Sequence, residues 1–473
     1  MNVSMSSPRT TGLTTLCLLL SCRIVFATDV SQATDPNVPP PNPANISPTL
    51  SPLPGTVGPT DIGNSASTPS TMALPASSAN GAVPTTVGSG APLDAANAHK
   101  FYTFSADLRE TYDDNVNTTS SNKLTALETT ISPSVLVDFP SGTDNDDFSA
   151  SYTFGATYYA YTTGTGDTWQ YTHQFVAQLK HSFSDRFNLN VSEDFIDSPE
   201  PNIYGTTGTP FRDGQNISNA FNAGFSAQWT PLIGSQTTYT NTLVRYLDNP
   251  SAAIGQNNDE NTASQSISYT VTPTINVSLG GIYDNVTYES IARGYTSYTG
   301  FIGGGWQALP NVNASLRVGG SITDSEQQQL DGTVGTVETV SPYVDLSGSW
   351  QIGSRSSLQA DYTHETSPSD YVGSSAQESD RVSGTFNYAV TPQLSTHLQL
   401  SYSNNVVSQT EVFDTTLTNG YTETVYAVDA GASYNFVKYF SLTFDITSTG
   451  VSSELPDQNY TRDQVSFGVR GTY

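Results

Sequence analysis

Cysteine is nearly absent from this chain of 473 residues, and its two examples, Cys17 and Cys22, both stand close to the start. Disulfide bonds and cysteine-based metal sites are therefore excluded from the remainder. Histidine is also scarce, and no two histidines have the spacing of metal ligands. The five are His99, His173, His181, His364 and His397. Neither a Gly-x-Ser-x-Gly element nor a phosphate-binding loop occurs. We predict no catalytic residue, no metal, no cofactor and no enzymatic activity.

Basic residues are few. The chain has 16 Lys and Arg against 43 Asp and Glu, which gives a formal net charge of -27. A surplus of acid repels a polyanion, so it argues against nucleic acid as a partner. The same surplus, placed around a pore, would attract cations and reject anions. The alternative is that the acids only keep exposed loops solvated.

No apolar run is long enough to cross a bilayer as a helix. The longest, Leu13 to Ser21, is far shorter than the roughly 20 residues required, so a signal peptide over residues 1–27 is the better interpretation. Val25-Phe26-Ala27 is an ordinary cleavage site, which we favour. Leu19 to Cys22 resembles a lipobox, which would instead leave Cys22 lipidated.

Residues 28–99 lack the aromatic and aliphatic side chains that a folded core needs. The segment consists largely of Pro, Ser, Thr, Ala and Gly, and Pro39-Pro40-Pro41 blocks helix and sheet alike. We predict a disordered periplasmic linker, with a tether to the cell wall or a partner as the alternative. A folded plug domain before a barrel is excluded.

From residue 100 onward, the chain consists largely of long segments in which apolar and polar residues alternate. At its end, Val465, Phe467, Val469 and Tyr473 share one face, while the intervening positions are polar or glycine. A period of two indicates strands whose two faces meet different solvents. The terminal Tyr473, with Gly468, resembles the C-terminal assembly signal of bacterial outer-membrane barrels, although Gly471 stands where that pattern usually has a bulky apolar residue.

Short turn signals recur about every 40 residues, and longer polar connections lie between them, as in a transmembrane barrel. The turn signals are Pro140-Ser141-Gly142, Ser184-Asp185-Arg186, Pro231 to Gly234, Thr272-Pro273, Pro310-Asn311, Gly353-Ser354-Arg355, Thr391-Pro392 and Phe436-Val437-Lys438. We predict an all-β, antiparallel, up-and-down transmembrane barrel over residues 100–473, with about 18 strands (16–18).

A soluble β-sandwich would also alternate, but two features favour a membrane barrel. The segments reach about ten residues, whereas strands of soluble proteins average roughly five or six. Aromatic residues also recur just before the short turns, as in an interfacial girdle: Phe183, Trp229, Tyr269, Trp306, Trp350, Tyr388 and Tyr434.

Charged residues on the inward-facing positions are the candidate lumen lining. We expect acidic and basic side chains in nearly equal numbers there. The candidates are Asp107, Arg109, Lys180, Arg317, Asp345, Asp361, Arg381, Asp429, Asp445 and Arg470. The remaining acid is then expected in turns and loops, including Asp113, Asp114, Asp248, Asp259, Glu260, Asp324, Glu326, Asp331 and Asp370. Asp361 and His364 are the nearest thing to a catalytic pair, but alternation places them on opposite faces.

A Tyr followed by Asp and Asn recurs at Tyr112 to Asn115, Tyr246 to Asn249 and Tyr283 to Asn285. We interpret it as an outer girdle residue followed by the start of a loop, because Asp and Asn side chains bond their own backbone in turns. Divalent-cation binding by loop carboxylates beside lipopolysaccharide is the alternative.

The segments Tyr112 to Asn117 and Leu127 to Pro133 resemble the opening of the beta-barrel porin 2 family. The resemblance implies an outer-membrane barrel in a Gram-negative cell. It also implies the barrel assembly machinery, outer-membrane lipid and lipopolysaccharide as partners. Because several members are associated with exopolysaccharide clusters, it further implies exopolysaccharide export components.

Three functions fit the sequence: a passive porin for small solutes or exported polysaccharide, a structural or adhesive surface barrel without an open pore, and a soluble secreted β-protein. We favour the first. Conductance in a planar bilayer separates the first two, and dependence on detergent tests the third.

The terminal aromatic residue provides the first test. We expect Tyr473→Ser to reduce assembly into the outer membrane while secretion to the periplasm continues, because the assembly signal loses its aromatic end. Cell fractionation with heat-modifiable gel migration measures both. Unchanged surface levels would show that Tyr473 is ordinary strand sequence.

Overall fold

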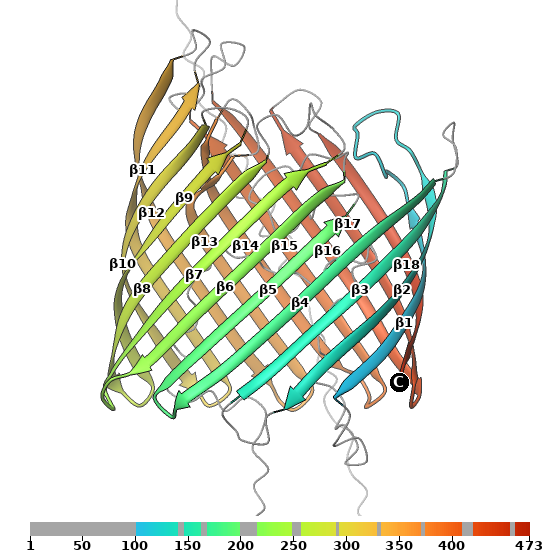
Figure 1. Ribbon diagram of the computed structural model, residues 1–473, viewed down its shortest axis with the longest axis horizontal. Helices are drawn as coiled ribbons and strands as arrows, with labels where there is room; N and C mark the ends of the chain where they lie inside the picture. Colours follow the sequence, from blue (N-terminus) through green and yellow to red (C-terminus); the bar gives the residue numbers. More distant parts are fainter. Residues whose placement is uncertain are drawn as a thin grey trace, which may run out of the picture. The chain divides into compact units, whose positions relative to one another are not determined.

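Eighteen strands make up the described part of the chain, and they form one antiparallel sheet (Figure 1). The computed structural model describes residues 101–140, 146–161, 168–198, 215–247, 257–289, 293–328, 333–369, 374–408, 420–454 and 459–473. The chain divides into two units, Met1–Thr56 and Val57–Tyr473, and all strands belong to the second. The predicted signal peptide and linker lie outside the described residues.

The strands follow one another around the sheet in chain order. They are β1 (Tyr102–Asp113), β2 (Ala126–Pro140), β3 (Asp146–Tyr161), β4 (Thr168–Ser184), β5 (Phe187–Ser198), β6 (Asn216–Gln228), β7 (Ile233–Tyr246), β8 (Asn258–Thr272), β9 (Ile275–Tyr288), β10 (Arg293–Leu309), β11 (Val312–Gln328), β12 (Val334–Ile352), β13 (Ser356–Pro368), β14 (Ala376–Ala389), β15 (Leu394–Val407), β16 (Tyr421–Val437), β17 (Phe440–Ser453) and β18 (Tyr460–Thr472).

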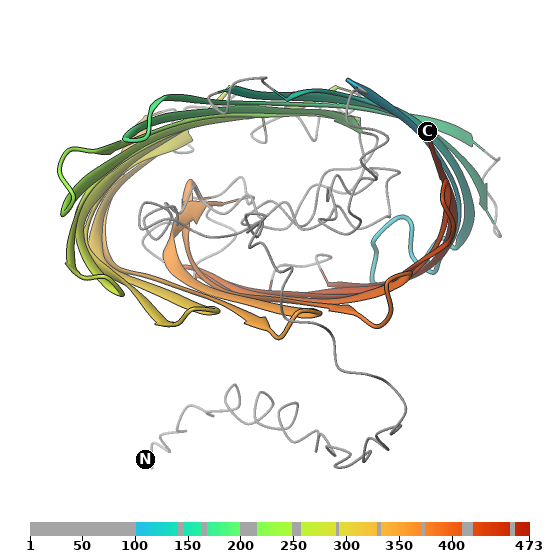
Figure 2. The same ribbon diagram turned by 90° about the horizontal axis from the view of Figure 1, so that it is seen from below.

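The sheet closes on itself because β1 pairs with β18. Their register runs from Ser105 opposite Thr472 to Asp113 opposite Gln464. The backbones of Phe104 and Tyr473 add two further hydrogen bonds, of 3.1 and 2.8 Å. Figure 2 shows the resulting ring of strands, seen from below. The prediction of a closed up-and-down barrel with about 18 strands is therefore confirmed.

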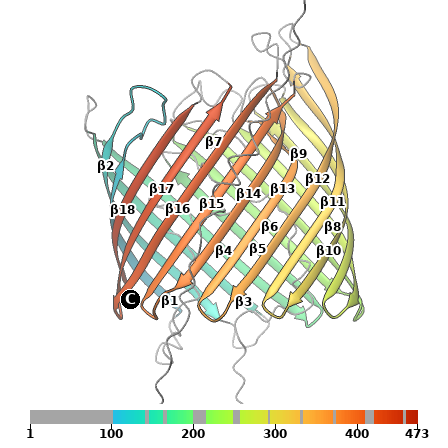
Figure 3. The same ribbon diagram turned by 180° about the vertical axis from the view of Figure 1, so that it is seen from behind.

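The short connections gather at one end of the barrel, and the C-terminus lies at the same end (Figures 1 and 3). Each predicted turn signal falls at or beside a junction between consecutive strands, such as Pro310 and Asn311 between β10 and β11. Proline at a junction gives up no ladder hydrogen bond, which explains why these residues mark the ends of strands. The described connection between β1 and β2, residues 114–125, lies at the other end.

The β1–β18 seam is fastened by buried polar groups. The Asp113 carboxylate is fully buried and accepts hydrogen bonds from Arg462 Nε at 2.7 Å and Gln464 Nε2 at 2.8 Å. It also accepts one from the backbone N–H of Asn115 at 2.8 Å, as expected of an aspartate that begins a turn. Asp113 is therefore the end of a strand and not an exposed loop acid, which corrects our prediction.

Lower on the same seam, Gly468 faces the interior. A Cβ atom there would lie 2.6 Å from the hydroxyl oxygen of Thr443 and 3.6 Å from Arg109 Nε. The glycine therefore leaves room for the side chains of the neighbouring strands. Whether it also takes part in assembly remains a proposal.

One pair of neighbours separates before it reaches the upper end. β12 pairs with β13 only from Ile352 opposite Ser356 up to Val344 opposite His364. Above that point, β12 continues to Val334 along β11, while β13 continues to Pro368 along β14. The two strand ends therefore diverge, and this divergence shapes the candidate site.

No helix among the described residues is long and apolar enough to span a membrane.

The seam offers a stability test with a control in the adjacent residue. Asp113→Ala leaves Arg462 buried without its carboxylate, a change that typically costs about 3–5 kcal/mol. Asp114 is half-buried, pairs with Lys123 at 3.7 Å and accepts a hydrogen bond from the Asp463 backbone N–H at 2.7 Å, so Asp114→Ala should cost only about 1 kcal/mol. Denaturant unfolding of the two variants in detergent measures the difference. Equal losses would show that the buried pair does not secure the seam.

Candidate functional site

The two faces of the barrel wall differ in polarity. Outward side chains are large, apolar and exposed, as shown by Leu108 at 52%, Ile302 at 61% and Val340 at 74%. The predicted girdle residues are all exposed: Phe183, Trp229, Tyr269, Trp306, Trp350, Tyr388 and Tyr434. The inner wall carries hydroxyl and amide groups, and one stretch of it is lined by Ser226, Gln236, Ser264, Ser266, Ser278 and Ser315. The molecule is thus apolar outside and polar inside.

The upper end of β13 and β14 turns into the barrel. We call its described residues, Glu365–Ser369 and Ser374–Gln377, the inner hairpin. The orange strand end inside the ring of Figure 2 belongs to this region. The Thr366 and Ser341 hydroxyls lie 2.9 Å apart, although β12 and β13 are no longer paired there. Ser375 Oγ donates to the backbone carbonyl of Glu326 on β11 at 2.6 Å. The inner hairpin therefore packs against the inside of the β11–β12 wall.

Ser369 shows how far the inner hairpin reaches. Its backbone carbonyl accepts hydrogen bonds from Tyr288 on β9, at 3.1 Å, and from the Arg293 guanidinium on β10. Its hydroxyl lies 3.1 Å from the Tyr421 hydroxyl on β16. Strands β9 and β16 are far apart in the order of the sheet. A residue that touches both must lie within the lumen, so the inner hairpin narrows the passage.

An apolar contact supports the same arrangement. Ala376 is fully buried in a cluster with Val286, Tyr288 and Tyr295 on β9 and β10. Arg293 is 4% exposed, its Nε donates to the Ser374 carbonyl at 2.8 Å, and its guanidinium lies 3.8 Å from the centre of the Tyr288 ring. The inner hairpin is therefore held by hydrophobic packing, hydrogen bonds and a cation–π contact together.

Acidic side chains face the space beneath the inner hairpin. Glu365 pairs with Arg381 at 3.1 Å. Glu260 on β8 is near enough to Asp284, Glu365 and Arg381 for their charges to interact. Asp284 accepts hydrogen bonds from the Tyr295 hydroxyl at 2.5 Å and from Thr262 at 2.9 Å. We call Glu260, Asp284, Glu365 and Arg381 the constriction cluster, in which acid exceeds base.

Of this cluster, only Arg381 is predicted from the sequence to line the lumen. Glu260, which we expected in a loop, lies in β8. Asp284, which we expected at the start of a loop, lies inside β9. Continuing the alternation of Asn276, Ser278 and Gly280 would have placed Asp284 inward. The inward approach of β13 and β14 has no comparable signal in the sequence.

Other predicted loop acids also belong to strands. Asp259 lies in β8, and Asp324 and Glu326 lie in β11, whereas Asp114 follows β1 as expected. Asp248, Asp331 and Asp370 lie outside the described residues, as does the end of the Tyr246 to Asn249 motif. Beyond the predicted inner-face charges, Glu260, Asp284 and Glu365 add acid to this face, and Arg293 and Arg462 add base.

Five of the predicted lumen residues lie together at the seam, on strands β16, β17, β18 and β1: Asp107, Arg109, Asp429, Asp445 and Arg470. Asp107 and Arg109 are buried and 3.5 Å apart. His397, which the lumen prediction omitted, donates a hydrogen bond from Nε2 to the Asp429 carboxylate at 2.7 Å and lies 3.8 Å from Asp445.

The other predicted residues are distributed around the wall. Arg317 and Asp345 are register neighbours on β11 and β12, and Asp361 lies near Asp345 on β13. Lys180 lies apart on β4, opposite Asp147 and Asn190. His364 bonds with Asp380 at 2.9 Å on the outer face, away from Asp361. In the described part of the chain, no three His, Cys, Asp or Glu side chains are placed to hold a metal ion.

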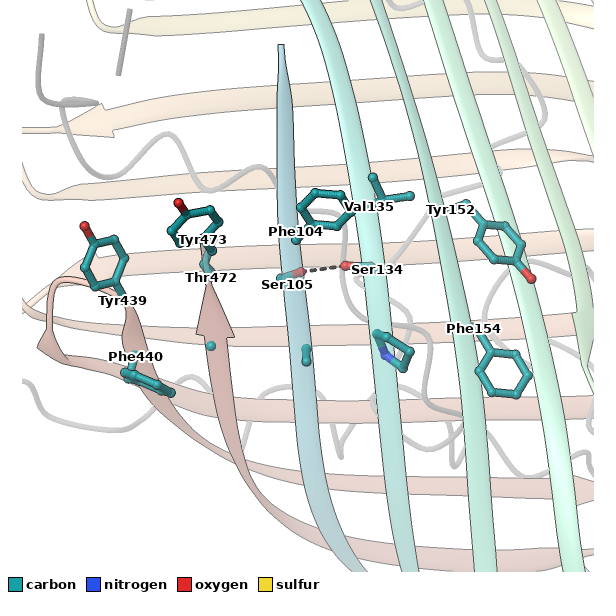
Figure 4. Close-up of a pocket in the computed structure, with 13 residues that line it drawn as sticks. Phe104, Ser105, Ser134, Val135, Tyr152, Phe154, Tyr439, Phe440, Thr472 and Tyr473 are labelled. Carbon is teal, nitrogen blue, oxygen red and sulfur yellow. Dashed lines mark hydrogen bonds between the residues drawn. The ribbon is translucent and has the colours of Figure 1, made fainter. Parts of the chain in front are cut away.

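A second concave feature lies on the outer face beside the C-terminus. This hollow of about 740 Å³ has a floor that includes Ala106, Pro133 and Gly471. Figure 4 shows Tyr439 and Phe440 to one side of it and Tyr152 and Phe154 to the other, with Tyr473 and Phe104 between them. Gly471 departs from the usual terminal pattern, and its missing side chain helps to form this hollow.

Comparison with known proteins leaves the family open. No protein-family model matches the chain. No curated protein matches it either. Among solved structures, Acinetobacter baumannii OccAB3 is similar at 11% identity and a TM-score of 0.40, over 79% of this chain and 99% of that one. Pseudomonas aeruginosa OprD is similar at 10% identity and a TM-score of 0.40, over 79% of this chain and 95% of that one. The outer membrane protein opdK from Pseudomonas aeruginosa is similar at 11% identity and a TM-score of 0.41, over 79% of this chain and 99% of that one. The fold assignment rests on the strand pairing within this chain.

Proposed function

We propose that this chain is an outer-membrane channel through which small hydrophilic solutes diffuse. The observation that carries the proposal is the polarity of the closed wall, which is apolar outside and polar inside. A water-soluble barrel would have the opposite arrangement, with its apolar side chains packed in the interior. A bilayer matches this wall, because hydrocarbon can cover the outer face while water fills the inner one.

Closure of the sheet supports the same proposal. Unpaired backbone groups are costly in hydrocarbon, and the β1–β18 pairing removes the two edges that an open sheet would present. The girdle residues at the short-turn end would lie at one headgroup level. In this orientation the short turns and the predicted linker are periplasmic, and the long connections face outward, towards lipopolysaccharide.

The constriction cluster supports selectivity for charge. Screening in bulk solution acts over about 8 Å, so carboxylates gathered this closely would act on a passing solute before salt screens them. The inner-wall charges named from the sequence would line the rest of the path. Passage of exported polysaccharide, and partners in its export, rest on the family resemblance alone.

Conductance is the primary test. Purified protein in a planar bilayer should form discrete channels, because the lumen is lined by groups that water and ions wet. A folded barrel that never conducts would support the alternative, a structural or adhesive surface barrel with no open pore.

The charge of the constriction predicts ion preference. Wild-type channels should favour potassium over chloride, and Glu365→Gln should lower that preference by removing a carboxylate from the constriction cluster. The reversal potential in a salt gradient measures it. Glu110→Gln is the matched control, since Glu110 is exposed on the outer face of β1. Similar shifts from both variants would contradict the assignment of Glu365 to the path.

Membrane insertion predicts unequal effects of arginine on the two faces of β15. Leu400 is 48% exposed on the outer face, and an arginine at a lipid-facing midplane site costs about 2–4 kcal/mol. Leu400→Arg should therefore lower the melting temperature of the barrel in liposomes. Ser401→Arg, one residue further along on the inner face, should leave it nearly unchanged. Equal tolerance would show that the outer face does not contact lipid.

A further inference from the structure

The inner hairpin depends on two residues of the nearby wall, on β9 and β10, that the proposed function does not require. Arg293 and Tyr288 both reach the Ser369 carbonyl, and Arg293 also binds the Ser374 carbonyl at 2.8 Å. Ser369 and Ser374 are the described residues on either side of the β13–β14 connection. The same arginine therefore fixes both arms of the inner hairpin.

We propose that Arg293 and Tyr288 are the positioning residues that hold the inner hairpin across the lumen and thereby set the size limit of the channel. This inference rests on the proposed channel function. It goes beyond that function because it identifies two residues outside the constriction cluster that determine which solutes pass.

The chemistry of the contact suits a fixed element. The planar guanidinium of arginine presents several N–H donors in fixed directions, so it can bind two carbonyl oxygens at once. The Tyr288 ring supports its face at 3.8 Å, and Tyr288 itself is 7% exposed. Burial of Ser369, Ser374 and Ser375 to 0% exposure shows that the two arms are enclosed by the wall.

The other contacts of the inner hairpin complete the span. Ser375 binds the Glu326 carbonyl on β11, and Ser369 meets Tyr421 on β16. If the Arg293 and Tyr288 hydrogen bonds are lost, the arms keep their contacts with β11 and β16, and the packing of Ala376 is the described contact that still attaches them to β9 and β10. The side of the passage towards β9 and β10 would then widen.

The test compares size dependence with overall conduction. Arg293→Ala and Tyr288→Phe should raise the permeability of large sugars relative to small ones several-fold in liposome swelling, with a smaller change for the smallest solute. Arg293→Lys should have an intermediate effect, because an ammonium group cannot reproduce the planar two-carbonyl contact. Arg245→Ala is the control. Arg245 lies on β7, where it pairs with Glu289 at 2.8 Å, and it makes no described contact with the inner hairpin.

A second measurement does not depend on transport. Ser374→Cys introduces a thiol at a buried position whose carbonyl Arg293 binds, and this thiol should resist a maleimide reagent in the wild-type background and react in the Arg293→Ala background. The same chain without the introduced thiol gives the background labelling. If Arg293→Ala and Tyr288→Phe fold but leave both the size ratio and the labelling unchanged, the inference is wrong. If labelling rises in a barrel that never conducts, the positioning role stands, whereas the channel function and the size limit fail together.

Discussion

Pairing of backbone hydrogen-bond groups is the constraint on which this structure depends. In the proposed membrane setting, a wall one sheet thick offers its peptide groups no partner except a neighbouring strand. The pairing of β1 with β18 satisfies that requirement for the first and last strands, over the register from Ser105 to Asp113. Alternation then follows, because each strand of a single closed layer sends successive side chains to opposite solvents.

The seam shows how the closure is secured. Backbone pairing alone does not distinguish one register from another, and a slip of one residue would exchange the two faces. The buried contacts of Asp113 with Arg462 and Gln464 can form only in the observed register. The space above Gly468, which the Asp107 and Arg109 side chains approach, adds a second point of registration. The polar interior thus contributes to the specificity of the fold as well as to the lining of the lumen.

Local sequence determines most of this architecture. Turn residues such as Pro310 and Gly353 mark the strand junctions, and alternation such as Phe440, Leu442, Phe444 assigns residues to faces, because both effects depend on neighbours in the chain. The constriction cluster could be predicted only in part. Asp284 follows from alternation, but its approach to Glu365 requires the inner hairpin to bend inward. That bend depends on contacts between residues such as Arg293 and Ser374, which are distant in sequence and carry no local pattern.

The departure of β13 from β12 also affects the outside of the barrel. Above Val344, β12 pairs only with β11 among the described residues, so the stretch from Val334 to Pro342 forms the border of the sheet. Such borders recruit strands from other molecules and promote aggregation. Two residues counteract this: Pro342 lacks the N–H group that an added strand would need, and Glu338 places a charge beside the border. Bending a hairpin into the lumen therefore leaves an unpaired strand edge on the wall. The sequence of β12 contains residues that disfavour pairing of this edge with a strand from another molecule.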